Sequence, residues 1–323
     1  MNSFGHHFRI SLYGESHGES LGVIIDGCPP GIEIKEEDFR IDLSRRKSGA
    51  KGTTKRTEDD FPYIHSGVYQ GKTTGAPIHI SFQNNNIQSS DYKNIAQIPR
   101  PGHADFTAYS KYKGFNDPRG GGHFSGRLTL AIVAAGILAK KIIPHVKINA
   151  NLTHVGGSNQ IDIEIDKAIQ NNDSIGGVIE CTANNVPIGI GEPFFDSIES
   201  KISHLIFSIP AIKGIEFGKG FASAAMIGSE MNDAYIKAGI TSTNHAGGIN
   251  GGISNGNQIV FRVAVKPTSS ISKPQQSFNL KTGEKQILEI KGRHDVCIAL
   301  RMPVIIEACC AIVLADFSLG SDL

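Results

Sequence analysis

Residues 126–143, GRLTLAIVAAGILAKKII, decide the fold class of this chain. The segment is apolar around most of its circumference, and its small residues Ala134, Ala135 and Gly136 allow a neighbouring helix to approach closely. We therefore expect a central, almost fully buried helix here. A second apolar helix is expected over residues 300–314.

Outside these helices, short apolar runs bounded by turn residues predict strands in both halves of the chain. The strands are expected at residues 9–13, 21–26, 73–82, 147–155, 175–182 and 259–265. A short helix from Glu36 to Lys47 has an acidic first turn and a basic last turn, which matches the helix dipole. A further helix is expected over 197–207 with Asp196 as its N-cap, and residues 52–62 are expected to form an exposed loop.

This mixture of elements predicts a layered α+β architecture, which an internal duplication would explain. No linker rich in Pro, Ser or charge separates the two halves. Residues 1–323 are therefore expected to form a single domain.

The composition narrows the classes of function. With 32 Lys and Arg against 31 Asp and Glu, the formal net charge is +1, so no global attraction to nucleic acid or to an anionic membrane is expected. The longest apolar run, around 130–139, is shorter than the roughly 18 residues that span a bilayer. The five cysteines are odd in number and lie in apolar surroundings, which favours reduced thiols. We expect a soluble, cytoplasmic protein without a nucleic-acid or membrane partner.

Two histidines are candidates for acid–base chemistry. His17 lies in GESHG at residues 14–18, and His103 lies in RPGHAD at residues 100–105. Each imidazole is placed between flexible backbone and charged residues, where it serves proton transfer better than core packing. Neither has His or Cys partners at the short spacing of a zinc site, so no metal is expected.

The GESHG segment also matches the G-x-S-x-G nucleophile elbow of serine hydrolases, with Ser16 as the nucleophile. That elbow needs a strand before it and a helix after it, whereas a strand is expected at 21–26. A tight hairpin with an incidental histidine would explain the glycines but not the Glu-Ser-His run.

Several segments are suited to anions. The glycines at 120–122 precede the central helix and are bordered by His123 and Arg127, which favours phosphate or carboxylate binding over a plain glycine loop. The cluster KPTSS at 266–270 offers a cation and three hydroxyls to a phosphate. The basic run between 45 and 56 lacks interleaved aromatic residues, so it fits a small polyanion better than nucleic acid.

Two further motifs are less specific. The glycine-rich stretch GGINGG at 247–252 is similar to a dinucleotide fingerprint, but the segment that follows it is a predicted strand and not a helix. In GRHD at 292–295, Asp295 could steer a proton close to a cofactor or belong to a salt-bridged turn.

Taken in order, these motifs resemble those of the chorismate synthase family from about Gly5 to Phe317. The resemblance is carried by GESHG with DGCP (26–29), RPGHAD, RGGG (119–122) with SGR (125–127), NHAGG (244–248), KPTSS and GRHD. It implies conversion of 5-enolpyruvylshikimate 3-phosphate to chorismate by anti 1,4-elimination of phosphate, the last common step of the shikimate pathway. The reaction needs reduced FMN without net redox change.

By position in these motifs, the resemblance implies roles for individual residues. His17 would protonate the departing phosphate, His103 would protonate the anionic reduced flavin, and Asp295 would assist proton movement at the flavin N5. The anionic groups of the substrate would be held by Arg46, Arg100 and Arg127. FMN would contact Ser125, Ala211, Gly251, Lys266, Pro267, Thr268, Ser269, Ser270 and Arg293.

The resemblance also implies an architecture and partners. The fold would be a β-α-α-β sandwich with central buried helices between antiparallel sheets, assembled as a homotetramer. Reduced FMN would come from an external reductant. NADPH is expected only as a source of reduced flavin, although Arg46 also matches the family's pyridine-nucleotide position.

The chain departs from the commonest family pattern near its cofactor motifs. His123 and Phe124 stand where Arg and Ser are frequent, so a permanent charge becomes a titratable one and a hydroxyl becomes a ring. Lys51 stands where Arg is frequent, and the segment between Val155 and Ile175 is short. A serine hydrolase using Ser16, and a non-enzymatic flavin- or phosphate-binding protein with structural histidines, are the alternative functions.

Overall fold

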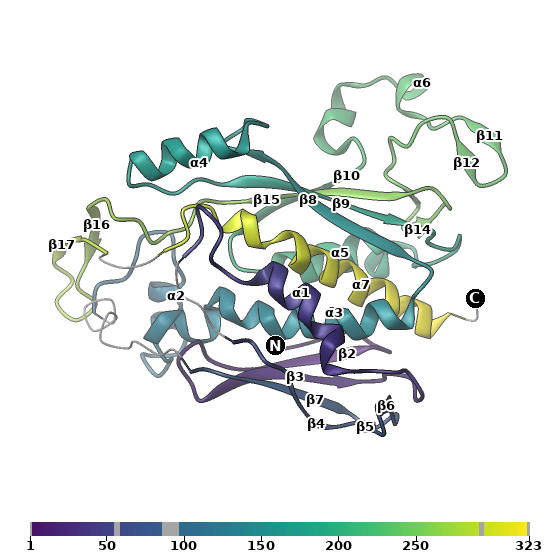
Figure 1. The fold of residues 1–323 in the computed structure, drawn as a ribbon. Helices are drawn as coiled ribbons and strands as arrows, with labels where there is room; N and C mark the ends of the chain where they lie inside the picture. The colour runs from purple at the N-terminus through teal and green to yellow at the C-terminus, as the bar shows by residue number, and fades with distance from the viewer. Residues whose placement is uncertain (1, 55–58, 86–96, 291–293, 322–323) are drawn as a thin grey trace.

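The computed structural model describes residues 2–54, 59–85, 97–290 and 294–321 (Figure 1). Two antiparallel sheets frame the fold, with strand orders β1-β2-β3-β7-β4 and β10-β15-β9-β8. The first sheet contains β1 (Ser3–Phe4), β2 (Arg9–Gly14), β3 (Ser20–Asp26), β4 (Tyr63–Ser66) and β7 (Ile78–Gln83). The second contains β8 (Lys147–Val155), β9 (Gly177–Asn184), β10 (Ile212–Phe217) and β15 (Ile259–Val265).

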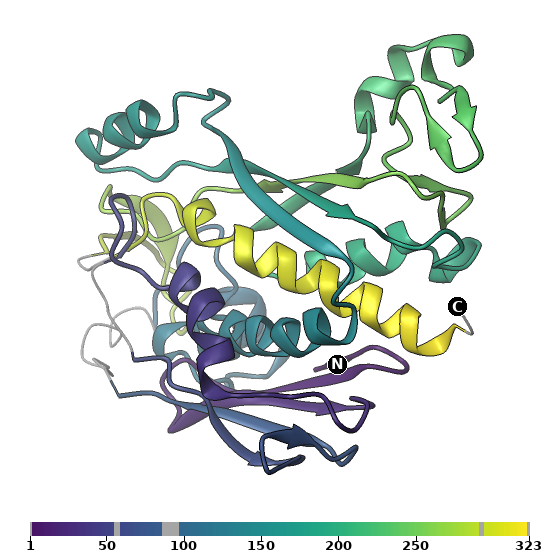
Figure 2. The ribbon, with the colours of Figure 1, turned by 45° about the vertical axis from the view of Figure 1, so that its right-hand side comes forward.

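Two long apolar helices, α3 (Thr129–Ile142) and α7 (Pro303–Gly320), lie between these sheets (Figures 1 and 2). Helix α3 packs against β2, β3 and β7, α7 packs against β8 and β9, and the two helices pack against each other. A Cβ atom on Gly136 would lie 2.4 Å from the Cβ of Ala308, so the glycine is needed for this close approach. The predicted mixed helix-and-sheet fold and the buried central helix are confirmed.

The other elements surround this core or project from it. The remaining helices are α1 (Glu36–Arg46), α2 (Asp105–Lys111), α4 (Ile161–Gln170), α5 (Ile198–Phe207) and α6 (Gly228–Met231). Short strand pairs are formed by β5 (Val68–Tyr69) with β6 (Lys72–Thr73), β11 (Tyr235–Lys237) with β12 (Ile240–Thr241), β13 (Ile249–Asn250) with β14 (Ile253–Ser254), and β16 (Gln275–Phe278) with β17 (Lys285–Leu288).

Helix α7 is the one described helix that is long and apolar enough to cross a membrane, and 72% of it is buried inside the fold, as expected for a core helix. Its carboxylate Glu307 is 2% exposed and accepts two 2.7 Å hydrogen bonds from Arg45, on α1, and one of 3.1 Å from Lys140, on α3. Burial by itself would raise the pKa of Glu307, but these cations hold it below its ordinary value. The charge is therefore tolerated in an apolar helix because it is fully paired.

The strands predicted at 9–13, 21–26, 147–155 and 259–265 are observed, whereas several boundaries differ. The segment predicted as one strand over 73–82 contains a turn between β6 and β7, and the central helix begins three residues late, at Thr129. The last helix begins at Pro303, because proline favours the first helical turn. It continues to Gly320, six residues beyond the predicted end.

Two sequence predictions are wrong. Ser197, not Asp196, caps α5, and its Oγ accepts a 3.0 Å hydrogen bond from the Ser200 N–H while Asp196 pairs with Lys201. The segment 52–62 is not simply an exposed loop, since Asp60 is 6% exposed. Its carboxylate turns inward because two buried arginines surround it. Helix α4 and strand β10 were not anticipated.

The five cysteines are buried and free, in agreement with the expectation of reduced thiols. Burial raises the pKa of the Cys28 thiol to about 11 and that of the Cys309 thiol above its ordinary value. Burial therefore favours the protonated, unreactive form of the Cys28 and Cys309 thiols.

Candidate active site

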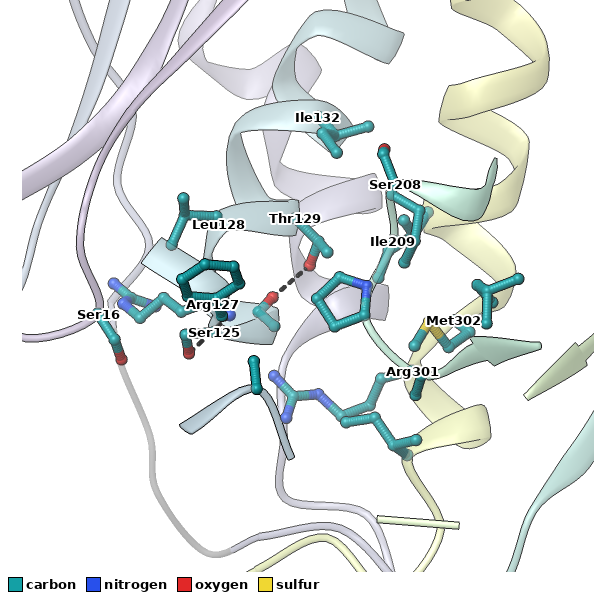
Figure 3. Close-up of a pocket in the computed structure, with 18 of the residues that line it drawn as sticks. Ser16, Ser125, Arg127, Leu128, Thr129, Ile132, Ser208, Ile209, Arg301 and Met302 are labelled. Carbon is teal, nitrogen blue, oxygen red and sulfur yellow. Dashed lines mark hydrogen bonds between the residues drawn. The ribbon is translucent and has the colours of Figure 1, made fainter. Parts of the chain in front are cut away.

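A cavity of about 760 Å³ lies beside the beginning of α3 (Figure 3). Ser125, Arg127 and Thr129 come from the segment that leads into α3, opposite Ile209 and Met302. The cavity brings together most of the residues that the sequence nominated, namely Arg46, Arg100, His103, Ser125, Arg127, Ala211, Lys266, Pro267, Thr268, Ser269, Ser270 and Asp295.

The glycine triplet forms a tight turn in which Gly120, Gly121 and Gly122 have φ values of 59°, 83° and 53°. L-residues rarely adopt this region, which explains the glycines. A Cβ atom on Gly120 would lie 2.6 Å from Nε2 of His17, and one on Gly121 would lie 3.3 Å from Cε1 of His103. The turn therefore lies against the rings of both candidate histidines.

The anion-site interpretation assumed that the glycines lead directly into the N-terminus of the central helix, and they do not. A separate turn of 3₁₀ helix, Gly126–Leu128, stands between them and α3. The glycine turn lets the backbone lie close to the two histidine rings, and a side chain at Gly120 or Gly121 would prevent this approach.

His103 is held by a buried carboxylate. Its Nδ1 lies 2.6 Å from Oδ1 of Asp105, and Arg100 donates to both oxygens of Asp105 from Nη2 at 2.8 Å and Nε at 2.7 Å. Burial by itself would raise the pKa of Asp105, but the hydrogen bonds from Arg100 and His103 lower it well below its usual range. Asp105 is thus a carboxylate that fixes the Nδ1–H tautomer of His103 and leaves Nε2 for proton transfer.

Two arginines of the cavity share one buried carboxylate. Asp60 accepts a 2.8 Å hydrogen bond from Arg127 and lies 3.6 Å from Nη1 of Arg46. Arg46 also donates to Thr129 Oγ1 and to the carbonyl of Gly126. Burial, together with the charges of neighbouring arginines, lowers the pKa of Arg46 to about 9. The excess positive charge at this wall is what an anionic ligand would neutralise.

The KPTSS segment forms a second polar wall. Lys266 donates from Nζ to the Gly102 carbonyl at 2.8 Å and to Ser269 Oγ at 2.8 Å, and burial lowers its pKa. The hydroxyl of Thr268 is buried and has no hydrogen-bond partner among the described residues. A buried hydroxyl without a partner is costly, so this wall fits a polar ligand such as a flavin phosphate or ring edge.

Asp295 lines the cavity and is held from two sides. Its carboxylate accepts from the Thr54 N–H at 2.9 Å and lies 3.2 Å from Nη1 of Arg301. Arg301 also lines the cavity, and its Nε donates to the Arg46 carbonyl at 2.9 Å. The sequence motifs did not point to Arg301 as a site residue, although a cation at the start of an apolar helix is a visible signal.

Some nominated residues lie elsewhere. His17 is 3% exposed and lies behind Gly120, so Gly120 and Ser16 contact the cavity while His17 does not line it directly. Gly251 is exposed in the turn between β13 and β14 and does not line this cavity, and Arg293 lies outside the described residues. The FMN contacts of these two residues, like those of the nominated residues that line the cavity, stay predictions.

His123 lines the cavity, but its ring nitrogens are directed to the protein. Nδ1 lies 2.8 Å from the Gly14 carbonyl oxygen and Nε2 lies 3.2 Å from Oδ1 of Asn2. The histidine therefore ties the glycine turn to the end of β2 and to the N-terminal segment, and a flavin contact from it stays a prediction.

The serine-hydrolase alternative loses its structural context. Ser16 lies in the loop between antiparallel β2 and β3, so no helix follows it as a nucleophile elbow requires. Within the described ranges, no group of three or more His, Cys, Asp or Glu side chains could hold a metal ion.

Sequence and structure comparisons with known proteins all point to one family. The family model described as chorismate synthase matches residues 8–319. The chain is 60% identical to a chorismate synthase of Chitinophaga pinensis, over 99% of this chain and 97% of that protein. It is 42% identical to one of Thermococcus kodakarensis, over 95% and 94% of the two chains. A crystal structure of a chorismate synthase aligns with a TM-score of 0.75 and 27% identity, over 98% of this chain and 93% of that one. Since the match extends through both sheets, both core helices and the cavity between them, the chain belongs to the chorismate synthase family.

Proposed function

We propose that the cavity beside α3 is the active site in which this chain eliminates phosphate from 5-enolpyruvylshikimate 3-phosphate. Chorismate synthases are carbon–oxygen lyases that carry out this step in the synthesis of aromatic amino acids, and the chain has this family activity. The observation that supports the location is the glycine turn, which lies against both candidate histidines at the edge of a cationic cavity.

The substrate carries one phosphate and two carboxylates, and the cavity offers cations for them. Arg46, Arg100 and Arg127 line it, and all three guanidinium groups are anchored by carboxylates or backbone carbonyls. Anchored cations lose little side-chain freedom when an anion binds. They would therefore orient the substrate as well as attract it.

The two histidines, whose rings lie against the glycine turn, would move the protons. His17 would protonate the departing phosphate, which is a poor leaving group until its charge is reduced. His103, with Nδ1–H directed to Asp105, would take up and deliver a proton at Nε2. Asp295, which the Thr54 N–H and Arg301 fix in place, would assist proton movement at the cofactor.

The residues present fit FMN, because the Thr268 hydroxyl is buried without a partner beside Lys266 and Ser269. Ser125, Ala211 and the segment 266–270 would hold the cofactor from this cavity, and Gly251 and Arg293 are proposed as further contacts. When bound, reduced FMN supplies electron density transiently to the substrate. The chain's own contribution is to bind, orient and deliver protons.

We further propose that the chain forms a single domain with the β-α-α-β sandwich of the family, assembles as a homotetramer and works in the cytoplasm. The packing of α3 on the first sheet and of α7 on the second supports the sandwich. The two glycine-rich stretches lack a complete dinucleotide motif, which supports an external source of reduced FMN.

The test is an anaerobic assay with substrate and photoreduced FMN that follows chorismate absorbance. His17→Ala and His103→Ala should each fold, bind substrate and lose turnover by about 10²–10⁴-fold. Near-wild-type turnover in both variants would remove the acid–base assignment. Complete loss in Ser16→Ala with both histidines dispensable would support the hydrolase instead.

A separate assay tests the source of the reduced flavin. Reductase-free protein supplied with NADPH and FMN in air should show little turnover, and photoreduced FMN under anaerobic conditions should restore it. Robust aerobic turnover with NADPH alone as reductant would contradict an external source.

A further inference from the structure

Asn84 joins two parts of the candidate site through a single side-chain amide. It directly follows β7 and is 7% exposed. Its Nδ2 donates to the carbonyls of Glu15 at 3.1 Å and Gly18 at 2.8 Å, while its Oδ1 accepts from Nε of Arg127 at 2.7 Å. The Asn84 amide therefore connects the loop that carries His17 to Arg127, the arginine that lines the cavity.

The loop from Glu15 to Gly18 is short, and the two carbonyls that Nδ2 contacts lie on either side of His17. The backbone N–H of Asn84 adds a 3.2 Å hydrogen bond to the Glu19 carbonyl. On the opposite side of the loop, the Ser16 N–H donates to Gly122 in the glycine turn at 3.1 Å. The position of His17 relative to the cavity thus depends on contacts to β7 and to the glycine turn.

Arg127 is the other end of this connection. Asp60 accepts a hydrogen bond from its Nη1 at 2.8 Å, and the Arg127 side chain is 8% exposed and lines the cavity. A carboxamide is the one side-chain group of this size that offers two N–H donors and an acceptor together, and a carboxylate could satisfy the arginine but not the two carbonyls.

We propose that Asn84 is a positioning residue that sets the His17 ring relative to Arg127, and so places the proton donor relative to the bound anionic group of the substrate. This inference rests on the proposed role of His17. It assigns no chemical step to Asn84, which acts through the loop. A displacement of about 1 Å at a reacting group is enough to lower turnover by about 10²-fold.

Asn84→Asp distinguishes the hydrogen bond from Arg127 from the two hydrogen bonds to the loop that carries His17. The variant keeps an oxygen for Arg127 Nε but directs an oxygen instead of an N–H donor toward the Glu15 and Gly18 carbonyls. We expect kcat to fall by about 10–10²-fold and KM to change much less, since the arginine keeps its partner. Asn85→Asp, at the exposed next position, adds the same charge and should retain wild-type kcat.

The direct readout is the ring resonance of His17 in histidine-labelled protein, assigned by its loss in His17→Gln. Its chemical shift and pH titration should change in Asn84→Asp and in the uncharged Asn84→Ala, and stay unchanged in Asn85→Asp. Asn84→Ala also keeps the test valid if the aspartate variant does not fold. Far-ultraviolet circular dichroism establishes folding for each variant.

The outcomes distinguish the inference from the proposed function. Wild-type kcat and an unchanged His17 resonance in both Asn84 variants would overturn the positioning role while leaving His17 as the acid. Full turnover in His17→Ala would overturn the proposed function, whatever the Asn84 variants do to the resonance.

Discussion

The Nδ1 atom of His103 lies 2.6 Å from Oδ1 of Asp105, and Arg100 donates hydrogen bonds to both oxygens of the same carboxylate. Sequence position alone nominated the histidine and the arginine but left the carboxylate between them unassigned. Because that carboxylate selects which ring nitrogen carries the fixed proton, the orientation of His103 is a property of the cluster of three.

Asp105→Asn should lower turnover by about 10- to 10²-fold, part of the 10²–10⁴-fold that a general acid–base group contributes. The amide presents no negative charge to Nδ1–H, so the ring is held less firmly in one tautomer. Steady-state kinetics with photoreduced FMN across pH would measure the effect. The exposed Asp162→Asn, on α4, is the control, and equal kcat in the two variants would contradict an orienting role for Asp105.

The same substitution should change the pH dependence of stability. The pKa of Asp105 is lower in the fold than in the unfolded chain, so its contribution is fully present above about pH 4 and is lost as pH falls through the folded value. At neutral pH, Asp105→Asn should reduce the free energy of unfolding by about 1–3 kcal/mol. Urea denaturation at a series of pH values should show this difference closing in acid, and a gap that widens as pH falls would have the wrong sign.

Gly120→Ala should lower turnover by more than the strain of an alanine at a positive φ would cause. The added Cβ would lie 2.5 Å from Cδ2 and 2.6 Å from Nε2 of His17, so the ring must move. Gly31→Ala is the matched control, because Gly31 also has a positive φ, of 86°, but a Cβ there meets nothing within 4 Å. Both variants should lose roughly 1 kcal/mol of stability to strain. In the kcat measurement, the Gly120 variant should lose about 10²-fold and the Gly31 variant should match wild type.

Asp60→Asn should be strongly destabilising. Its carboxylate is buried with Arg127 at 2.8 Å and Arg46 at 3.6 Å, and its removal leaves two buried cations without this partner. We expect a loss of about 3–5 kcal/mol in the free energy of unfolding, measured by chemical denaturation. Asp59→Asn, at the exposed neighbouring position, should stay close to wild type. Addition of phosphate should stabilise Asp60→Asn more than wild type if the freed cations bind anions, and an equal response would argue against that.

Much of the fold followed from local patterns. The strand runs at 9–13 and 259–265 were found almost to the residue, because alternation with a period of two is visible within a short window. The buried α3 was found because its segment is apolar around most of its circumference. Ordered motifs such as RPGHAD then carried the family resemblance, and with it the choice of cavity residues such as Arg46, His103 and Asp295.

The tertiary structure decided which of these residues contact one another. Asp60 reaches Arg127 across 67 positions, and Asn84 reaches the His17 loop across more than 60. No periodicity or capping rule encodes such contacts, since they exist only after both sheets have packed on α3 and α7. The sequence by itself determined the two core helices, several of the sheet strands, the mixed helix-and-sheet class of the fold and the family. The buried partners of His103, Arg46 and Arg127 were decided by packing, because a polar side chain in the interior must find its hydrogen-bond partner wherever the fold brings one within reach.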